Sequence, residues 1–281
     1  MRNASVAVCL VGAMRTFEEP RIIWSFRHHL IDVLQHNTQN GGRVHVDLFA
    51  VLTTHDATPK NGTWFAAKRD VDIGIALKVL GRVSEFTNVV AVEVSSNAYD
   101  LHNNNRTDSW GRKRIFGMVS RWAECMDLIE AAERESQIVY DAIVRTRPDI
   151  LWFDDHPPLH LQDDHLNMSY LSPSISNIDW HFVLSRGMAH ILMRVEDEPV
   201  FTEDELLNPF HWKQVLKSTV RTMRHNCPPR QMCVAETQFP AVVVRNSINE
   251  TSAFEVCKIS AAATTSWNLT AAQICELAYS T

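Results

Sequence analysis

Short apolar runs alternate with stretches of helical periodicity along the first 155 residues of the chain. Continuous apolar runs predict strands buried on both faces, whereas apolar residues three and four positions apart predict helices packed on one side. We expect strands at 6–11, 44–52, 89–94 and 140–149, and helices after Pro20, at 73–80 and at 110–135. The last of these strands should break at Pro148. This alternation is typical of the α/β class, with a mostly parallel sheet flanked by helices.

The second half of the chain has a different pattern. Strand-like segments at 169–171 and 180–184 precede an expected helix at 186–195, and Thr202-Glu-Asp-Glu205 is a capping box that predicts a helix toward His225. No stretch has the length and composition of a linker between independent domains. We therefore expect a single domain over residues 1–281, with an α-rich C-terminal part.

The composition excludes several classes of protein. An apolar share of 45%, with 8 Trp and 12 Phe among 281 residues, predicts a large folded core rather than a disordered chain. The 27 basic residues against 33 acidic ones leave no positive surplus for a nucleic acid backbone. No apolar run approaches the roughly 20 residues that cross a bilayer, so we expect neither nucleic acid binding nor membrane insertion by this chain.

Cysteines and glycosylation motifs bear on the compartment. Cys227 and Cys233 are spaced to close a small loop, Cys257 and Cys275 form a second possible pair, and Cys9 and Cys125 are expected to be buried thiols. Motifs of the type Asn-x-Ser/Thr begin at Asn3, Asn61, Asn105, Asn167, Asn249 and Asn268. These features favour a secretory or Golgi lumen, with a cytoplasmic location as the alternative.

The segment Val11-Gly-Ala-Met-Arg-Thr-Phe17 leaves the first expected strand. Gly12 permits a tight backbone path, and Arg15 would lie at the carboxyl edge of the sheet, where an anionic group such as a diphosphate binds. The alternative is an ordinary strand-to-helix turn with a solvated arginine. Neither a phosphate-binding loop of the G-x-x-x-x-G-K type nor a G-x-G-x-x-G fingerprint is present, so P-loop hydrolases and Rossmann dehydrogenases are not supported.

The segment Tyr140-Asp-Ala-Ile-Val-Arg-Thr-Arg-Pro-Asp149 ends in an unusual set of charges. If the chain is extended, Arg145, Arg147 and Asp149 share one face of the strand. Burying such a trio is costly unless the charges pair with one another or meet a ligand at the sheet edge. The segment therefore predicts either an anion and metal site or a structural cluster of ion pairs.

These two segments, together with Asp179-Trp-His-Phe-Val-Leu-Ser-Arg-Gly-Met188, resemble a family of GT-A-fold glycosyltransferases of bacteria, algae and large algal viruses. The likeness covers roughly residues 5–245. It implies a GT-A fold, with residues 1–155 binding a nucleotide sugar and 156–281 forming the acceptor side. The implied reaction transfers a hexose, or a pentose such as xylose, from a UDP-sugar to a hydroxyl of a glycan acceptor.

The resemblance also implies the roles of individual residues. In GT-A enzymes an Asp-x-Asp motif at the end of a central strand holds a divalent metal on the donor diphosphate, and the matching position here is Arg-Pro-Asp149, without the first Asp. We expect Mn²⁺ or Mg²⁺ at Asp149, with Asp154 and Asp155 as a second possible metal pair. The candidate donor-binding residues are Val11, Gly12, Ala13, Arg15, Arg121, Arg145, Arg147 and Asp149.

Two carboxylates are candidates for the general base that deprotonates the acceptor hydroxyl. Asp179 lies in the stretch that the resemblance assigns to the acceptor side, although an Asp at a strand start is also an ordinary turn residue. Glu236, in Ala235-Glu-Thr-Gln238, resembles the acidic residue that follows a short helix in these transferases. Residue types alone do not choose between Asp179 and Glu236.

Other motifs support alternative interpretations. Asp70-Val-Asp72 is a literal Asp-x-Asp, but its place before a helical pattern favours a helix start. The stretch from Asp154 to His165 contains residue types that suit a metal-dependent hydrolase, without the spacing of a defined ligand motif. Trp110, Trp122, Trp152, Trp180 and Trp212 are more typical of core positions than of sugar platforms. A non-catalytic sugar-binding protein on the same fold is the other alternative.

Overall fold

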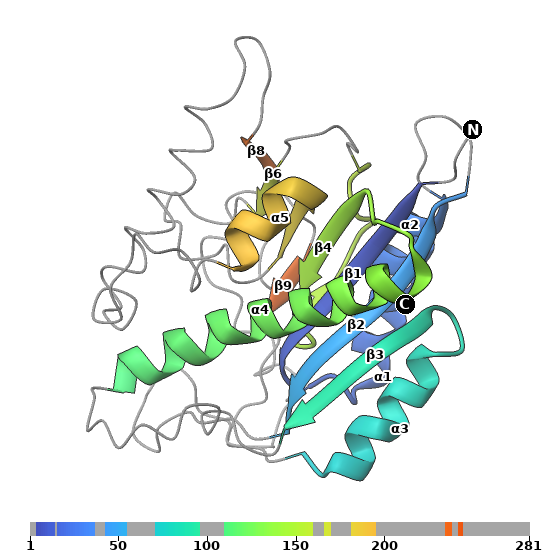
Figure 1. Ribbon diagram of the computed structural model, residues 1–281. Coiled ribbons are helices and arrows are strands. Elements are labelled where there is room, and N and C mark those ends of the chain that lie inside the picture. The colour runs from blue at the N-terminus through green and yellow to red at the C-terminus, as the bar shows by residue number, and fades with distance from the viewer. Residues whose placement is uncertain are drawn as a thin grey trace.

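The computed structural model describes residues 4–14, 16–36, 43–54, 71–95, 110–159, 166–169, 181–194, 234–237 and 241–243. Within these ranges, the backbone alone is described at 95, 110–119, 166–169, 191, 234–237 and 242–243. Strands alternate with helical segments from Ser5 to Thr146 (Figure 1).

The central feature is a seven-stranded, mostly parallel sheet. Its order is β3-β2-β1-β4-β7-β6-β8, in which β3, β2, β1 and β4 are parallel to one another and β7 is antiparallel to both of its neighbours. The strands are β1 (Ser5–Ala13), β2 (His45–Thr53), β3 (Asn88–Ser95), β4 (Ala142–Thr146), β6 (Leu166–Ser169), β7 (Phe182–Ser185) and β8 (Val234–Thr237). A second, two-stranded sheet pairs β5 (Ile150–Trp152) with β9 (Ala241–Val243). The α/β class with a mostly parallel sheet is therefore confirmed.

Helices cover both faces of this sheet (Figure 1). On one face lie α1 (Pro20–Ser25), the π-helical η1 (Phe26–Ile31), α2 (Asp32–His36) and α3 (Ile73–Val83). On the other face lie α4 (Trp110–Ser136) and α5 (Arg186–Met193). The apolar run of β1 has no polar alternation because Val8 and Leu10 face the first group of helices while Cys9 and Val11 face α4.

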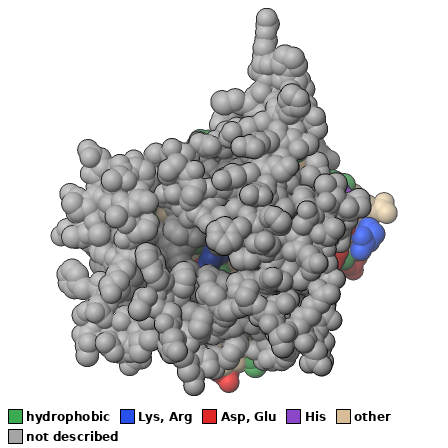
Figure 2. All heavy atoms as spheres, turned by 90° about the vertical axis from the view of Figure 1, so that its left-hand side faces the viewer, with side chains coloured by type: hydrophobic (Ala, Val, Ile, Leu, Met, Phe, Trp, Pro, Cys, Tyr) green, Lys and Arg blue, Asp and Glu red, His purple; other side chains and the backbone are tan. Residues whose placement is uncertain are grey.

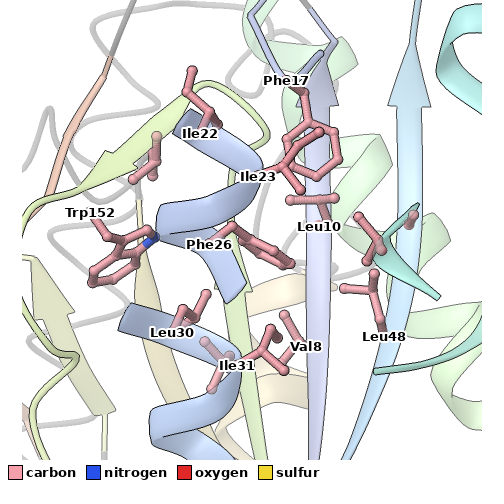
Figure 3. Close-up of a cluster of buried hydrophobic side chains, with 14 of the residues drawn as sticks. Val8, Leu10, Phe17, Ile22, Ile23, Phe26, Leu30, Ile31, Leu48 and Trp152 are labelled. Atoms are coloured by element: carbon pink, nitrogen blue, oxygen red, sulfur yellow. The ribbon is translucent and has the colours of Figure 1, made fainter. Parts of the chain in front are cut away.

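The first core is built around the helical segment that follows Pro20. Phe26, Leu30 and Ile31 pack against Val8 and Leu10 of β1, with Trp152 on the far side of the helix (Figure 3). Ser25 ties this helix to β5, because the Trp152 amide donates a hydrogen bond to its Oγ over 3.2 Å. Trp122 and Trp152 are both buried, as expected for core residues.

The strand expected from Tyr140 breaks at Pro148, as predicted. The structure ends β4 at Thr146, forms a turn at 148–149 and begins β5 at Ile150. Pro148 lacks the N–H that a continued ladder needs. The extended-chain argument that placed Arg145, Arg147 and Asp149 on one strand face is therefore wrong, since only Arg145 lies within the strand.

The Asp70-Val-Asp72 motif contributes the start of a helix. Asp72 is the N-cap of α3, and its Oδ1 accepts a hydrogen bond from the Gly74 amide over 2.7 Å. This is the capping interaction expected of an aspartate before a helix. The interpretation of Asp72 as a helix start is confirmed, and Asp70 lies outside the described residues.

Cys9 and Cys125 form a disulfide rather than two buried thiols, so that prediction is wrong. Cys9 points from β1 toward α4, and the helical stripe that buries Trp122 and Met126 also brings Cys125 to this face. The bond covalently joins the sheet to α4. Cys227, Cys233, Cys257 and Cys275 lie outside the described residues, as does the helix expected after Thr202.

Among the described residues, no helix combines the length and the apolar composition that a membrane span requires.

Candidate functional site

The connections between the strands create a switch point between β1 and β4. From β1 the chain passes over one face of the sheet to β2 and β3, and α4 then returns over the opposite face to β4, on the other side of β1. In open α/β sheets, ligands bind beyond the carboxyl ends of the strands at such a reversal. The residues that follow β1 and β4 therefore form the candidate site.

Two segments far apart in the sequence meet at this point. The parallel register pairs Leu10 with Thr146, which brings Gly12 beside Pro148. Gly12 lies within β1, which continues to Ala13, and not in a turn after the strand as expected. It has φ +145°, and a β-carbon built there would lie 3.2 Å from Pro148 Cδ. Val11 is buried in the α4-side core, and Ala13 is partly exposed at the end of β1. The structure thus brings the end of β1 close to the Arg147–Asp149 turn.

Arg147 and Asp149 form a bidentate ion pair within the second turn. Arg147 Nε donates to Asp149 Oδ1 over 2.7 Å, and Nη2 donates to Oδ2 over 2.8 Å. The Asp149 side chain is 0% exposed, whereas that of Arg147 is 11% exposed. Paired, charge-assisted hydrogen bonds of this kind fix the orientation of both groups.

Arg145 lies under α4. Its guanidinium carbon is 5.0 Å from the Trp122 ring centroid and 5.7 Å from that of Phe182, and the residue is only 2% exposed. Contact with aromatic faces is favourable for a guanidinium group that is largely removed from water. Within the site, this packing makes Arg145 a fixed positive charge behind the carboxyl edge.

Arg121 reaches the same edge from α4. It is buried, and its Nη1 lies 3.4 Å from Thr53 Oγ1 at the end of β2. The Thr53 carbonyl also accepts a hydrogen bond from the Met14 amide over 2.8 Å, which joins the ends of β1 and β2. Further buried hydroxyl groups at these strand and helix positions belong to Thr16, Thr54, Ser120 and Thr146. Guanidinium and hydroxyl groups are suitable donors to phosphate oxygens.

The strands β2 and β3 point toward the left of Figure 1, and Figure 2 views the molecule from that side. A basic side chain is visible there within a hollow of the surface. The carboxyl ends of β2 and β3 face the viewer in Figure 2, so this basic side chain is visible from the carboxyl edge of the sheet.

A buried pair of histidines lies beside the site. The His156 and His181 Nε2 atoms are 3.1 Å apart, and His156 Nδ1 donates to the Pro157 carbonyl over 2.6 Å. His156 Nε2 is therefore the acceptor, and His181 donates to it. Burial lowers the pKa of His156 to about 4, and burial, His156 and Arg145 lower the pKa of His181.

Sequence reasoning did not predict this pair. His181 precedes β7, whose pairing of Phe182 with Arg145 places His181 next to the carboxyl end of β4. His156 was noted only within the Asp154–His165 stretch. The available signal was His181 in the Asp-Trp-His-Phe stretch, but its partner depends on the register between β4 and β7.

The two candidate bases differ in what the structure describes. Glu236 lies on β8, opposite Met168 of β6, and β7 and β6 separate β8 from β4. Strand spacing alone places the Glu236 backbone about 14 Å across the sheet from β4. Asp179 lies outside the described residues, as does Arg15.

The described carboxylates fit a divalent cation poorly. Both oxygens of Asp149 accept from Arg147, Asp155 Oδ1 lies 2.9 Å from His29 Nδ1, and Asp154 Oδ1 accepts from the Asp155 amide. Asp154 and Asp155 are exposed. Within the part of the chain that the structure describes, no three His, Cys, Asp or Glu side chains are grouped for metal binding. This finding also gives no support to a hydrolytic metal site at residues 154–159.

No protein-family model matches the chain, and a search of curated proteins finds no significant match.

Proposed function

We propose that the chain is a glycosyltransferase that transfers a sugar from a UDP-sugar to a hydroxyl group of a glycan. The observation that carries the proposal is the close approach of Gly12, near the end of β1, to the Arg147–Asp149 turn at the switch point of a mostly parallel sheet. The missing side chain at Gly12 makes room for the Pro148 ring, which holds Arg147 at this edge together with Arg121 and Arg145. The GT-A fold and the UDP donor come from the sequence resemblance and belong to this proposal.

The basic residues supply the electrostatic part of the reaction. When the bond between the sugar and the diphosphate breaks, negative charge builds on the leaving diphosphate. Arg121 and Arg147 are held by Thr53 and Asp149 before the ligand arrives, so they need little reorganisation to stabilise this charge. Arg145 adds a fixed positive charge behind them.

The acceptor hydroxyl must lose a proton to a base as it attacks the anomeric carbon. Asp179 and Glu236 stay the two candidates. Glu236 is three strand positions from β4, and Asp179 lies outside the described residues. The distance of Glu236 from β4 disfavours it, so we take Asp179 as the base in this proposal.

A thermal-shift screen of nucleotides and sugars tests the proposal. Ligands that bind the native state raise the melting temperature. We expect UDP and UDP-sugars to stabilise the protein and adenine nucleotides to have no effect. Stabilisation by free glycans alone would instead identify a sugar-binding protein, and stabilisation by metal ions alone would favour a hydrolase.

A further inference from the structure

We propose that Asp149 is a positioning residue for Arg147 rather than a metal ligand, so that guanidinium groups bind the donor diphosphate without a divalent cation. The identity of the ligand as a diphosphate rests on the proposed function. The role of Asp149 as a partner of Arg147 rests on the geometry of the turn alone.

The hydrogen bonds of the Asp149 carboxylate leave no place for a metal ion. Both of its oxygens accept short hydrogen bonds from one guanidinium, and the side chain is 0% exposed. A Mg²⁺ or Mn²⁺ ion at this carboxylate needs room for an octahedral shell that usually retains several waters. A fully buried carboxylate already bound on both oxygens offers no such room.

The turn that contains Pro148 has a restricted backbone. Pro148 stands between the two charged residues, and its ring fixes one backbone dihedral of the turn. The same ring lies against Gly12, 3.2 Å from the position of an added β-carbon. Pro148 therefore holds the backbone on both of its sides against β1, which keeps Arg147 and Asp149 close to each other.

The Arg147–Asp149 pair balances a buried negative charge. A buried carboxylate without a partner costs several kcal/mol, and Arg147 removes that cost. The pairing uses Nε and Nη2, and Arg147 is the more exposed partner of the two. Asp149 therefore fixes the orientation of the Arg147 guanidinium.

Two further arginines, Arg121 and Arg145, lie near the Arg147–Asp149 turn. Arg121 at the end of β2 and Arg145 behind β4 bring two more positive charges to this edge. A guanidinium group neutralises negative charge on a diphosphate and binds two of its oxygens at once. A divalent cation would otherwise have these two roles. The cationic residues therefore compensate for the missing first Asp of the Asp-x-Asp motif.

Isothermal titration with UDP, in EDTA and in MnCl₂, tests this inference on the full chain. We expect the dissociation constants to agree within about threefold, and Arg147→Lys and Asp149→Asn to weaken binding by about tenfold even in EDTA. Arg27→Lys and Asp32→Asn, which alter an exposed ion pair, are matched controls without effect. Binding that tightens by about tenfold with Mn²⁺, with the gain lost in Asp149→Asn, would overturn the inference.

A second measurement separates this inference from the proposed function. The electron paramagnetic resonance signal of Mn²⁺ reports free and bound ion without any nucleotide. We expect Mn²⁺ to stay free in the presence of the wild-type protein, even if UDP does not bind and the transferase proposal fails. Mn²⁺ bound by the wild type but not by Asp149→Asn would make Asp149 a metal ligand. If the variants fail to fold, the Mn²⁺ signal with and without the wild-type protein still tests the inference: free Mn²⁺ supports it, and bound Mn²⁺ contradicts it.

Discussion

Gly12 and Pro148 lie in contact across the ends of β1 and β4, and a β-carbon at Gly12 would come within 3.2 Å of Pro148 Cδ. Gly12 also has φ +145°, a conformation that other residues rarely adopt. We therefore expect Gly12→Ala to lower the free energy of unfolding by about 1–3 kcal/mol and to weaken UDP binding.

Gly81→Ala provides the matched control for this variant. Gly81 lies within α3, and nothing lies within 4 Å of its added β-carbon. Alanine there should stabilise the protein by about 0.5–1 kcal/mol, since it restricts the unfolded chain. Urea unfolding measures both variants, and equal stability of the two would contradict the proposed contact.

Arg121 should contribute to UDP binding from within α4, beside the end of β2. We expect Arg121→Lys to weaken UDP by about tenfold, because lysine lacks the planar set of donors that bridges Thr53 and phosphate oxygens. Arg134→Lys, an exposed position on the same helix, should leave the affinity unchanged. Equal affinities of the two variants in isothermal titration would remove Arg121 from the site.

The Cys9–Cys125 disulfide should stabilise the protein. It joins residues that are 116 positions apart, and native disulfides of this kind contribute about 2–5 kcal/mol. We expect dithiothreitol to lower the urea midpoint of the wild type by more than that of the Cys9→Ala, Cys125→Ala double variant. Free thiols at both positions in the native protein, detected by alkylation and mass spectrometry, would show that the bond does not form.

The buried histidine pair should make stability depend on pH. The pKa of His156 falls from 6.5 in an exposed chain to about 4 in the native state, because burial disfavours the charged ring. Between these values the unfolded chain binds a proton that the native state does not, so stability falls as pH decreases. For His156 the loss reaches about 3 kcal/mol near pH 4.

His181→Gln separates this effect from general acid denaturation. The Gln amide retains a donor toward His156 but does not titrate. We expect a shallower dependence of the unfolding free energy on pH between 4 and 6.5 than in the wild type. An identical dependence would mean that the pair is not the source of the acid sensitivity.

The candidate bases are distinguished by single replacements. Asp179→Asn should stop sugar transfer while UDP affinity stays near that of the wild type, because the base acts on the acceptor hydroxyl. Glu236→Gln should retain transfer, since Glu236 lies three strand positions from β4. Transfer assays and titration with UDP measure both effects, and loss of transfer in Glu236→Gln alone would reverse the assignment.

The local pattern of residues was sufficient to predict the order of strands and helices up to β4 and the α/β class, but not β5, β8 or β9. An apolar run such as Val6–Val11 can only be satisfied by burial on both faces, and the stripe around Trp122 requires a helix against the sheet. Asp72 was recognisable as a helix start because capping involves only neighbouring residues. Such features depend on interactions within a few positions of the chain.

The partners of individual side chains were decided by tertiary structure. Pairing of Cys9 with Cys125, of His156 with His181 and of Gly12 with Pro148 requires the register of strands and the packing of α4, which sequence spacing does not contain. Asp149 shows the difference most clearly. Its sequence position suggested a metal ligand, but the turn at Pro148 directs both of its oxygens to Arg147, because a backbone that bends brings together groups that an extended strand would separate.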